Sequence, residues 1–181
     1  MTSHPNPDQA QPEDIECWKQ QAEAGDVEAQ FSYAFVHYRG ERTTMDYSLA
    51  RKWFAVAVQQ GHTKSAFYLG VMLEHGWGGE TDLSGAATHY LKAAKANFMP
   101  AQHNLGRLFQ EGRGVLKNLA EAHFWLSVAA SNGGEHSQEG IDKFIGQMSN
   151  SEIDSVRRKV SEWSQGRLNI CLLYTSDAAD E

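Results

Sequence analysis

The chain has 181 residues, of which 41% are hydrophobic and 22% charged, and its formal net charge is -7. These values are typical of a globular protein that buries a real core. A basic surplus is missing, which argues against nucleic acid and anionic membranes as partners, and no apolar run approaches the roughly 18 residues of a membrane helix. The two cysteines, Cys17 and Cys171, make neither a disulfide framework nor a zinc site.

The two ends of the chain differ from the segment between them. Residues 1–12 are polar and contain proline, so we expect a disordered arm there. They lack the apolar core of a signal peptide, which favours the cytoplasm, or export by a signal that the chain does not carry. Residues 171–181 break the helical pattern and resemble the translation of a transposase sequencing adapter. We interpret this last segment as an artefact and leave it out of the fold.

Residues 13–25 predict a lone amphipathic helix, with Trp18 facing inward, that caps the N-terminal end of the fold. Three stretches then superpose without a gap at a spacing of 36 residues, over 26–61, 62–97 and 98–133. A fixed period in this range marks a stack of supersecondary units that bury one another's apolar faces. With its end caps, the stack predicts one domain over residues 13–165.

Each repeat predicts two short helices, which we name helix A and helix B. Apolar residues recur at three and four positions in helix A, and glycine ends it because glycine accepts the left-handed conformation. An Asp or Asn side chain then caps the start of helix B, and Gly or Asn ends it. The equivalent residues are Gly40, Gly76 and Gly112 after helix A, Asp46, Asp82 and Asn118 before helix B, and Gly61, Asn97 and Gly133 after helix B.

A small residue recurs inside helix A, at Ala34, Gly70 and Gly106. Tight helix packing needs small side chains at the point of contact, so we expect helix A to approach helix B closely there. Pro100 lies near the start of the third helix A, where a missing N–H costs little. The repeat therefore predicts both where its helices begin and where they touch.

Residues 134–165 predict two C-terminal capping helices. The first runs over 137–148 and is read as a further helix A, although Asp142 stands where the small residue is expected. The second opens at residues 151–152 and ends near Trp163. Atypical terminal units are expected in a stack because their outer faces meet water.

Several residues of the third repeat follow a known family pattern, namely Ala101, Leu105, Gly106, Leu108, Phe109, Gly112, Gly114, Val115, Ala122, Trp125, Ala129, Ala130 and Gly133. They resemble the Sel-1-like repeat, a relative of the tetratricopeptide repeat. The second repeat matches well but carries His89 in place of the tryptophan. The first departs most, with Arg42 and Thr43 where glycine and valine are usual.

The resemblance extends over roughly residues 13–165, and its closing residues 148–163 look like the tail that bacterial members often carry. It implies an all-α fold, a right-handed α/α solenoid of helix-turn-helix repeats. It also implies a role as an adaptor or scaffold in protein complexes, with the A helices lining a concave face.

On this arrangement, partner-binding residues are expected on helix A and in the loop after it. Phe35 and Tyr38 are the stronger contact candidates because neither position repeats as aromatic, whereas Phe31 and Phe67 fit packing between repeats. An apolar pocket beside polar anchors suits an extended peptide or a partner helix. The full set of candidates is Phe31, Phe35, Tyr38, Phe67, Val71, Glu74, Trp77, His103 and Arg107.

Tryptophan and histidine side chains are also considered as binding residues. Trp77 in its glycine-rich loop fits either an exposed contact residue or a plug folded over the loop. The histidines show no metal-ligand spacing, so no metal site is expected. His89 takes a core tryptophan position, and we expect it to be buried and hydrogen-bonded.

These observations favour a protein that binds a protein or peptide partner in its concave groove, without catalysis and without a cofactor. The alternative is an enzyme that binds or hydrolyses β-lactams, like the cysteine-rich branch of the family that the chain resembles. That branch carries a cysteine pair in each repeat, and this chain carries none. A further possibility is that the chain is the end of a longer repeat array.

Overall fold

The computed structural model describes residues 11–166, and these form α-helices and a short 3-10 helix with no strand. The first helix, α1, spans Pro12–Glu23. Residues 1–10 of the expected disordered arm lie outside the described residues. Its last two residues are described: Gln11 is the N-cap of α1, and Pro12 is the first residue of that helix. The expected artefact at 171–181 also lies outside the described residues.

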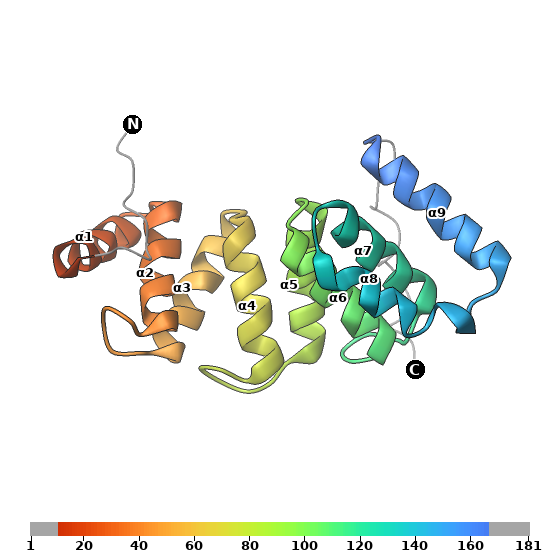
Figure 1. The fold of residues 1–181 in the computed structure, drawn as a ribbon. Helices are drawn as coiled ribbons and strands as arrows, with labels where there is room; N and C mark the ends of the chain where they lie inside the picture. Colours follow the sequence, from red (N-terminus) through yellow and green to blue (C-terminus); the bar gives the residue numbers. More distant parts are fainter. Residues whose placement is uncertain (1–10, 167–181) are drawn as a thin grey trace.

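The three repeats form successive helical hairpins of equal helix length. The A helices are α2 (Val27–Arg39), α4 (Thr63–His75) and α6 (Met99–Glu111), and the B helices are α3 (Tyr47–Gln59), α5 (Leu83–Lys95) and α7 (Leu119–Ser131). Each helix packs against its neighbours in sequence, so the hairpins stack in a row (Figure 1). The chain is an all-α helical repeat solenoid, as the sequence predicts.

The helix caps follow the repeat. The Asp46 and Asp82 side chains accept hydrogen bonds from the N–H groups of Leu49 and Gly85, at 2.9 and 2.8 Å. These bonds satisfy amides that the first turn of a helix leaves unpaired. Asn118 does the same for the third helix B, so all three predicted N-caps are confirmed.

The left-handed position after helix B is also confirmed. Asn97 has φ 61°, and it is the one residue other than glycine with a positive φ among residues 11–166. Asparagine tolerates this conformation better than other side chains do. The interruption of the glycine series at this position therefore preserves the turn rather than breaking it.

Helices A and B touch at the small residue. A Cβ atom added to Gly106 would lie 2.7 Å from Cγ of Leu126 on the facing helix B. At Gly70, the same atom would lie 2.8 Å from the ring of Tyr90. Both distances are shorter than carbon atoms tolerate, so the close approach predicted from the sequence is confirmed.

The C-terminal cap differs from the prediction. Helix α8 spans Glu135–Asp142 and ends well before residue 148, because the chain turns there to bury Phe144 in the core. A short 3-10 helix, Ile145–Gln147, follows. The last helix, α9 (Asn150–Ser164), begins with a capping box between Ser149 and Glu152.

Helix α9 packs against α7 (Figure 1). The ring of Trp163 lies 5.7 Å from that of Trp125 and 6.1 Å from that of Phe124, both edge-on. Position 124 is Lys52 and Thr88 in the two earlier repeats. The third helix B therefore carries an aromatic side chain where its equivalents carry polar ones, and α9 covers it.

Gly106→Leu is expected to destabilise the domain by about 2 kcal/mol or more, because the side chain overpacks the contact with α7. The matched control is Gly146→Leu, since a Cβ atom at Gly146 meets nothing within 4 Å. Urea unfolding followed by circular dichroism measures both. Equal midpoints for the two variants would contradict the close contact.

His123 on α7 is expected to make stability depend on pH. It is 6% exposed, its Nδ1 has no hydrogen-bond partner in the described chain, and burial together with the charge of Arg157 lowers its pKa below the ordinary 6.5. A lowered histidine pKa favours the neutral form in the folded state, so its stability contribution is present above pH 6.5 and lost as pH falls below that value.

The measurement is the urea midpoint of His123→Gln at neutral and mildly acidic pH. The variant should lose less stability on acidification than the parent chain, by some fraction of the roughly 1.4 kcal/mol per pH unit that one proton carries. His136→Gln is the control, because the side chain of His136 is 81% exposed. An unchanged pH dependence in His123→Gln would rule out this role.

Candidate functional site

The residues predicted to bind a partner lie on α2, α4 and α6 and in the loop after α4. We call this side of the stack the A-helix face. Three of the predicted residues are buried, with exposed fractions of 8% for Phe31, 8% for Phe35 and 5% for Glu74. The partly exposed ones are Tyr38, Phe67, Val71, Trp77, His103 and Arg107.

Among the aromatic candidates of helix A, the structure agrees with the expectation for Phe31, which is buried, and for Tyr38, which is partly exposed, but not for Phe35 and Phe67. Phe35 is buried because it stacks on Phe31, at 5.6 Å between ring centroids, and meets the ring of Tyr68 edge-on at 5.3 Å. Phe67, which fits packing between repeats in the sequence, is instead partly exposed. It still contacts the core through Tyr90 and Phe98. Of these residues, Phe67 offers more surface to a partner than Phe35.

Tyr68 is the important residue that the sequence analysis missed. Its ring stacks on Phe54 at 5.4 Å with an angle of 13°, and lies 5.3 Å from Tyr38. The equivalent positions in the other repeats are Ser32 and Asn104. An aromatic residue that breaks the repeat was the available signal, by the same criterion that selected Phe35 and Tyr38.

Rings of the first and second repeats meet in a cluster that we call the aromatic seam, formed by Tyr38, Phe54, Tyr68 and Trp77. Tyr38 connects the two repeats, because its ring lies 6.2 Å from Phe54 in the first and 5.9 Å from Trp77 in the second. Burial raises the pKa of Tyr38, and the nearby hydroxyls of Tyr68 and Tyr47 raise it further. The seam is therefore uncharged at neutral pH and offers apolar surface with hydroxyl groups.

Trp77 packs over the other rings of the aromatic seam. Its ring is nearly parallel to that of Tyr47, at 5.3 Å and 10°, and it also stacks on His75 at 4.8 Å. The loop after α4 packs tightly against the start of α3, because a Cβ atom on Gly78 would lie only 2.3 Å from the carbonyl oxygen of Tyr47. This packing supports the plug, while the partial exposure of Trp77 leaves part of the indole on the surface.

An ionic seam joins the second and third repeats at the equivalent positions. Glu74 accepts a hydrogen bond from the Tyr90 hydroxyl at 2.9 Å and pairs with Arg107 at 2.5 Å and with Arg113 at 3.2 Å. The expectation that Glu74 projects into a groove is therefore wrong. Its carboxylate is buried between repeats because four polar groups from α4, α5, α6 and the loop after α6 satisfy one another.

The equivalence of the two seams is visible position by position. The residues 36 positions before Glu74, Arg107, Arg113 and Tyr90 are Tyr38, Val71, Trp77 and Phe54. One set of positions thus holds a carboxylate with its hydrogen-bond donors in one seam and mainly rings in the other. The partly exposed apolar residues among the predicted contacts, Tyr38, Phe67, Val71 and Trp77, consequently lie in the first two repeats, although the exposed Leu116 lies in the third.

The charges of the ionic seam support one another. Burial opposes the charge of Glu74, but hydrogen bonds and positive charge from Arg107, the Tyr90 hydroxyl and Arg113 outweigh it and lower the pKa of Glu74. Burial likewise opposes the charge of Arg107, and Glu74 outweighs that, so the pKa of Arg107 is raised. Burial and the negative charge of Glu74 raise the pKa of Tyr90. The phenol therefore donates and the carboxylate accepts.

His103 and His89 have distinct surroundings. His103 binds the Ser137 hydroxyl through Nδ1 at 2.9 Å, which ties α6 to α8. Burial and then the charge of Arg107 lower its pKa. His89 is partly exposed, and its Nδ1 is buried with no hydrogen-bond partner in the described chain, so the expectation of a satisfied core histidine is wrong. Within residues 11–166, no cluster of histidine, cysteine and acidic side chains is arranged to hold a metal ion.

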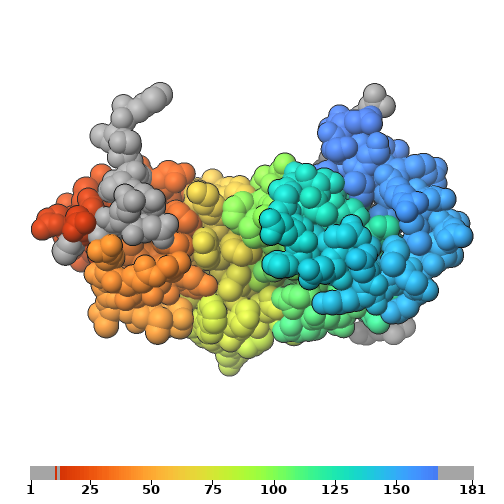
Figure 2. Space-filling view, viewed as in Figure 1, coloured from red at the N-terminus to blue at the C-terminus, as the bar shows by residue number. Residues whose placement is uncertain are grey.

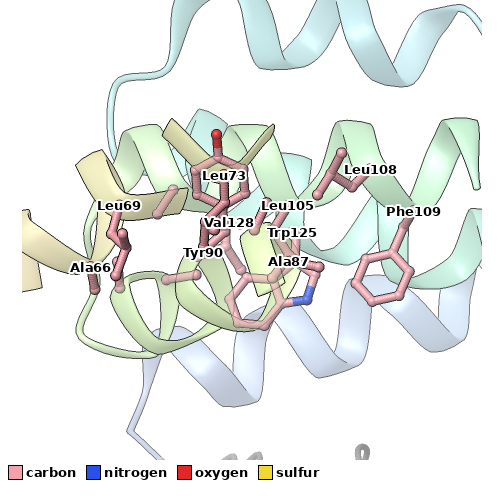
Figure 3. Close-up of a cluster of buried hydrophobic side chains, with 14 of the residues drawn as sticks. Ala66, Leu69, Leu73, Ala87, Tyr90, Leu105, Leu108, Phe109, Trp125 and Val128 are labelled. Carbon is pink, nitrogen blue, oxygen red and sulfur yellow. The ribbon is translucent and has the colours of Figure 1, made fainter. Parts of the chain in front are cut away.

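The core behind the A-helix face is continuous between repeats. Leu69, Leu73 and Tyr90 from the second repeat lie beside Leu105 and Trp125 from the third (Figure 3). Such a core holds neighbouring A helices in fixed register. No helix in the described part of the chain has the length and apolar character needed to span a bilayer.

Glu74→Leu is expected to destabilise the domain by about 2 kcal/mol or more, because it leaves the Tyr90 hydroxyl and Arg107 without their buried acceptor. Glu111→Leu is the control, since the exposed Glu111 contacts the same two arginines and its replacement is expected to change stability by less than about 1 kcal/mol.

The contribution of Glu74 to stability is present above pH 4.5 and is lost as pH falls below it, because the pKa of Glu74 is lowered in the folded state. Urea unfolding at neutral and acidic pH checks both, and equal losses in the two variants would contradict a buried pair.

Solved structures with the same architecture come from several bacteria. A Sel1 repeat protein from Oxalobacter formigenes has a TM-score of 0.64 and 31% identity, covering 72% of this chain and 98% of that one. A protective antigen of uropathogenic Escherichia coli with an SLR fold has a TM-score of 0.68 and 35% identity, covering 73% and 29%. The cysteine rich protein B of Helicobacter pylori, at 21% identity and a TM-score of 0.55, shares the fold, covering 70% and 91%.

Among characterised proteins, the rat DAP3-binding cell death enhancer 1 is 36% identical over 91 residues, which are 50% of this chain and 18% of that protein. The alginate biosynthesis protein AlgK of Azotobacter vinelandii is 24% identical over 135 residues, 75% of this chain and 29% of its own. The chain thus spans less than a third of the length of either relative.

The sequence model of the Sel1 repeat matches residues 27–62, 63–98 and 100–134. Proteins with this repeat are commonly protein-interaction adaptors, and their fold is typically a non-catalytic scaffold. Three matches in a row, on three hairpins of the structure, identify the chain as a member of the Sel1 repeat family.

Proposed function

We propose that this protein is a non-catalytic adaptor that binds a segment of a partner protein on its A-helix face, across the first two repeats. The observation that carries the proposal is the partial exposure of Tyr38, Phe67, Val71 and Trp77 on one side of the stack. All four pack against the continuous core and still reach the surface. Apolar side chains gathered in this way typically mark an interaction site.

The B helices give the contrast. The exposed side chains at the middle of these helices are polar, Lys52 on α3 and Thr88 on α5, and the partly exposed apolar ones beside them are Trp53 and Leu91. The polar groups give a partner little apolar area to bury. The A-helix face carries the larger group of partly exposed aromatic residues, which makes it the side better suited to a protein partner.

A protein segment fits the shape of the site better than a small molecule does. The partly exposed residues come from two successive A helices and a loop, so they are spread along the stack. In Figure 2 the upper margin of the molecule is lower over α4 and α5 than at α9. An extended surface built from repeats suits a long ligand, as in other solenoids. The rat relative is itself named for binding a protein.

Photo-crosslinking tests the proposal. A benzophenone amino acid replaces Phe67 or, as the control on helix B, Thr88, and the chain is irradiated in an extract of cells that express it. Position 67 should give a discrete crosslinked protein, and position 88 should give none. Val71→Glu should remove the crosslink without changing the helical circular dichroism, because the charge faces the bound segment.

Two outcomes would contradict the proposal. Equal crosslinking at positions 67 and 88 would remove the preference for the A-helix face. Saturable hydrolysis of a chromogenic β-lactam such as nitrocefin by the purified chain would support the enzyme alternative instead.

A further inference from the structure

The A-helix face has a charge preference that its ion pairs reveal. Every acidic side chain of α2, α4 and α6 already has a cationic or histidine partner in the described chain. Glu28 lies 3.5 Å from the ring of His62, Glu74 is buried with Arg107, and Glu111 pairs with the same arginine at 3.2 Å. Arg107 therefore compensates Glu74 and Glu111, whereas burial lowers the pKa of His62, so that Glu28, with its side chain 61% exposed, keeps its negative charge.

Lys64 is the exception among the cationic side chains of these helices. Its ammonium nitrogen lies 5.9 Å from the centre of the Phe31 ring, and no carboxylate of residues 11–166 lies within ion-pair distance of it. The side chain is exposed. Phe31 stacks on Phe35, and a second cation lies beside that ring. The guanidinium of Arg39 is 5.9 Å from the centre of the Phe35 ring and pairs with Glu41.

Lys64 also shares one side of α4 with the apolar contact residues. Phe67 and Val71 follow it at three and seven positions, a spacing that places side chains in line along a helix. A ligand on Phe67 and Val71 therefore lies beside an ammonium group that pairs with no carboxylate of residues 11–166. The overall charge of -7 does not reverse this local preference, because salt screens charges beyond about 8–10 Å.

We propose that the bound partner segment carries an acidic residue next to an apolar anchor. The anchor packs on Phe67 and Val71, and the carboxylate pairs with Lys64. This inference rests on the proposed function and specifies the partner for the same face. A basic segment would place like charges against Lys64 and Arg39, which disfavours the wrong partner as well as attracting the right one.

Fluorescence polarisation with three short labelled peptide pools tests the inference on the full chain. All pools share the same central aromatic and aliphatic residues, and their flanks are Glu and Asp, Gln and Asn, or Lys and Arg. The acidic pool should bind about two- to five-fold more tightly than the neutral pool, as expected for an exposed ion pair, and high salt should remove the difference. The basic pool should bind most weakly.

Lys64→Glu should invert the order so that the basic pool binds best. Lys52→Glu is the matched control, because the Lys52 ammonium also lies 5.9 Å from an aromatic ring, that of Trp53 on helix B of the first repeat. It should leave the order unchanged. Circular dichroism and urea unfolding verify that both variants are folded.

The outcomes separate the inference from the function on which it rests. Binding of all pools with no charge preference, or an order that Lys64→Glu does not alter, overturns the charge inference and leaves the adaptor proposal standing. Failure of every pool to bind, together with no crosslink from position 67, overturns both. Tighter binding of the basic pool to the parent chain contradicts the assigned partner chemistry directly.

Discussion

The close contact between helix A and helix B within each hairpin is the constraint on which the rest of the structure depends. Gly70 and Gly106 bring the two helices so near that an added Cβ atom would lie under 3 Å from the facing side chain. This proximity fixes the angle of each hairpin, and the 36-residue period then repeats it. Because the hairpins are alike, their A helices align on one side. The A-helix face is thus a consequence of packing that a single small residue per repeat permits.

The same set of positions carries different chemistry in successive seams. Tyr38, Val71 and Trp77 form a mostly aromatic contact, whereas Glu74, Arg107 and Arg113 form an ionic one. The scaffold accepts both because a repeat contacts only its neighbours, so one seam can change without altering the other. This independence explains how one fold can hold a mainly aromatic contact between the first two repeats and paired charges between the second and third.

The features that recur in every repeat were predictable from the sequence, including the close contact of helices A and B, whereas contacts peculiar to one pair of repeats were not. The caps at Asp46 and Asp82 and the turn at Asn97 follow from the conformational preference of one residue, which the repeat confirms three times over. The burial of Phe35 depends on Tyr68, a residue of the next hairpin, and no local pattern reports that contact. The early end of α8 depends on the core position of Phe144. In the site, residue types were correctly placed on helix A, but their exposure required the neighbouring repeat.

The position of Trp77 gives the protein a built-in optical reporter. The indole is partly exposed and lies within 6 Å of the rings of Tyr38 and Tyr47, so light absorbed by these phenols is transferred to it efficiently. Its emission depends on the polarity of its surroundings. A ligand that binds over the aromatic seam displaces water from the indole and changes the wavelength and intensity of its emission, a change superimposed on the emission of the other four tryptophans.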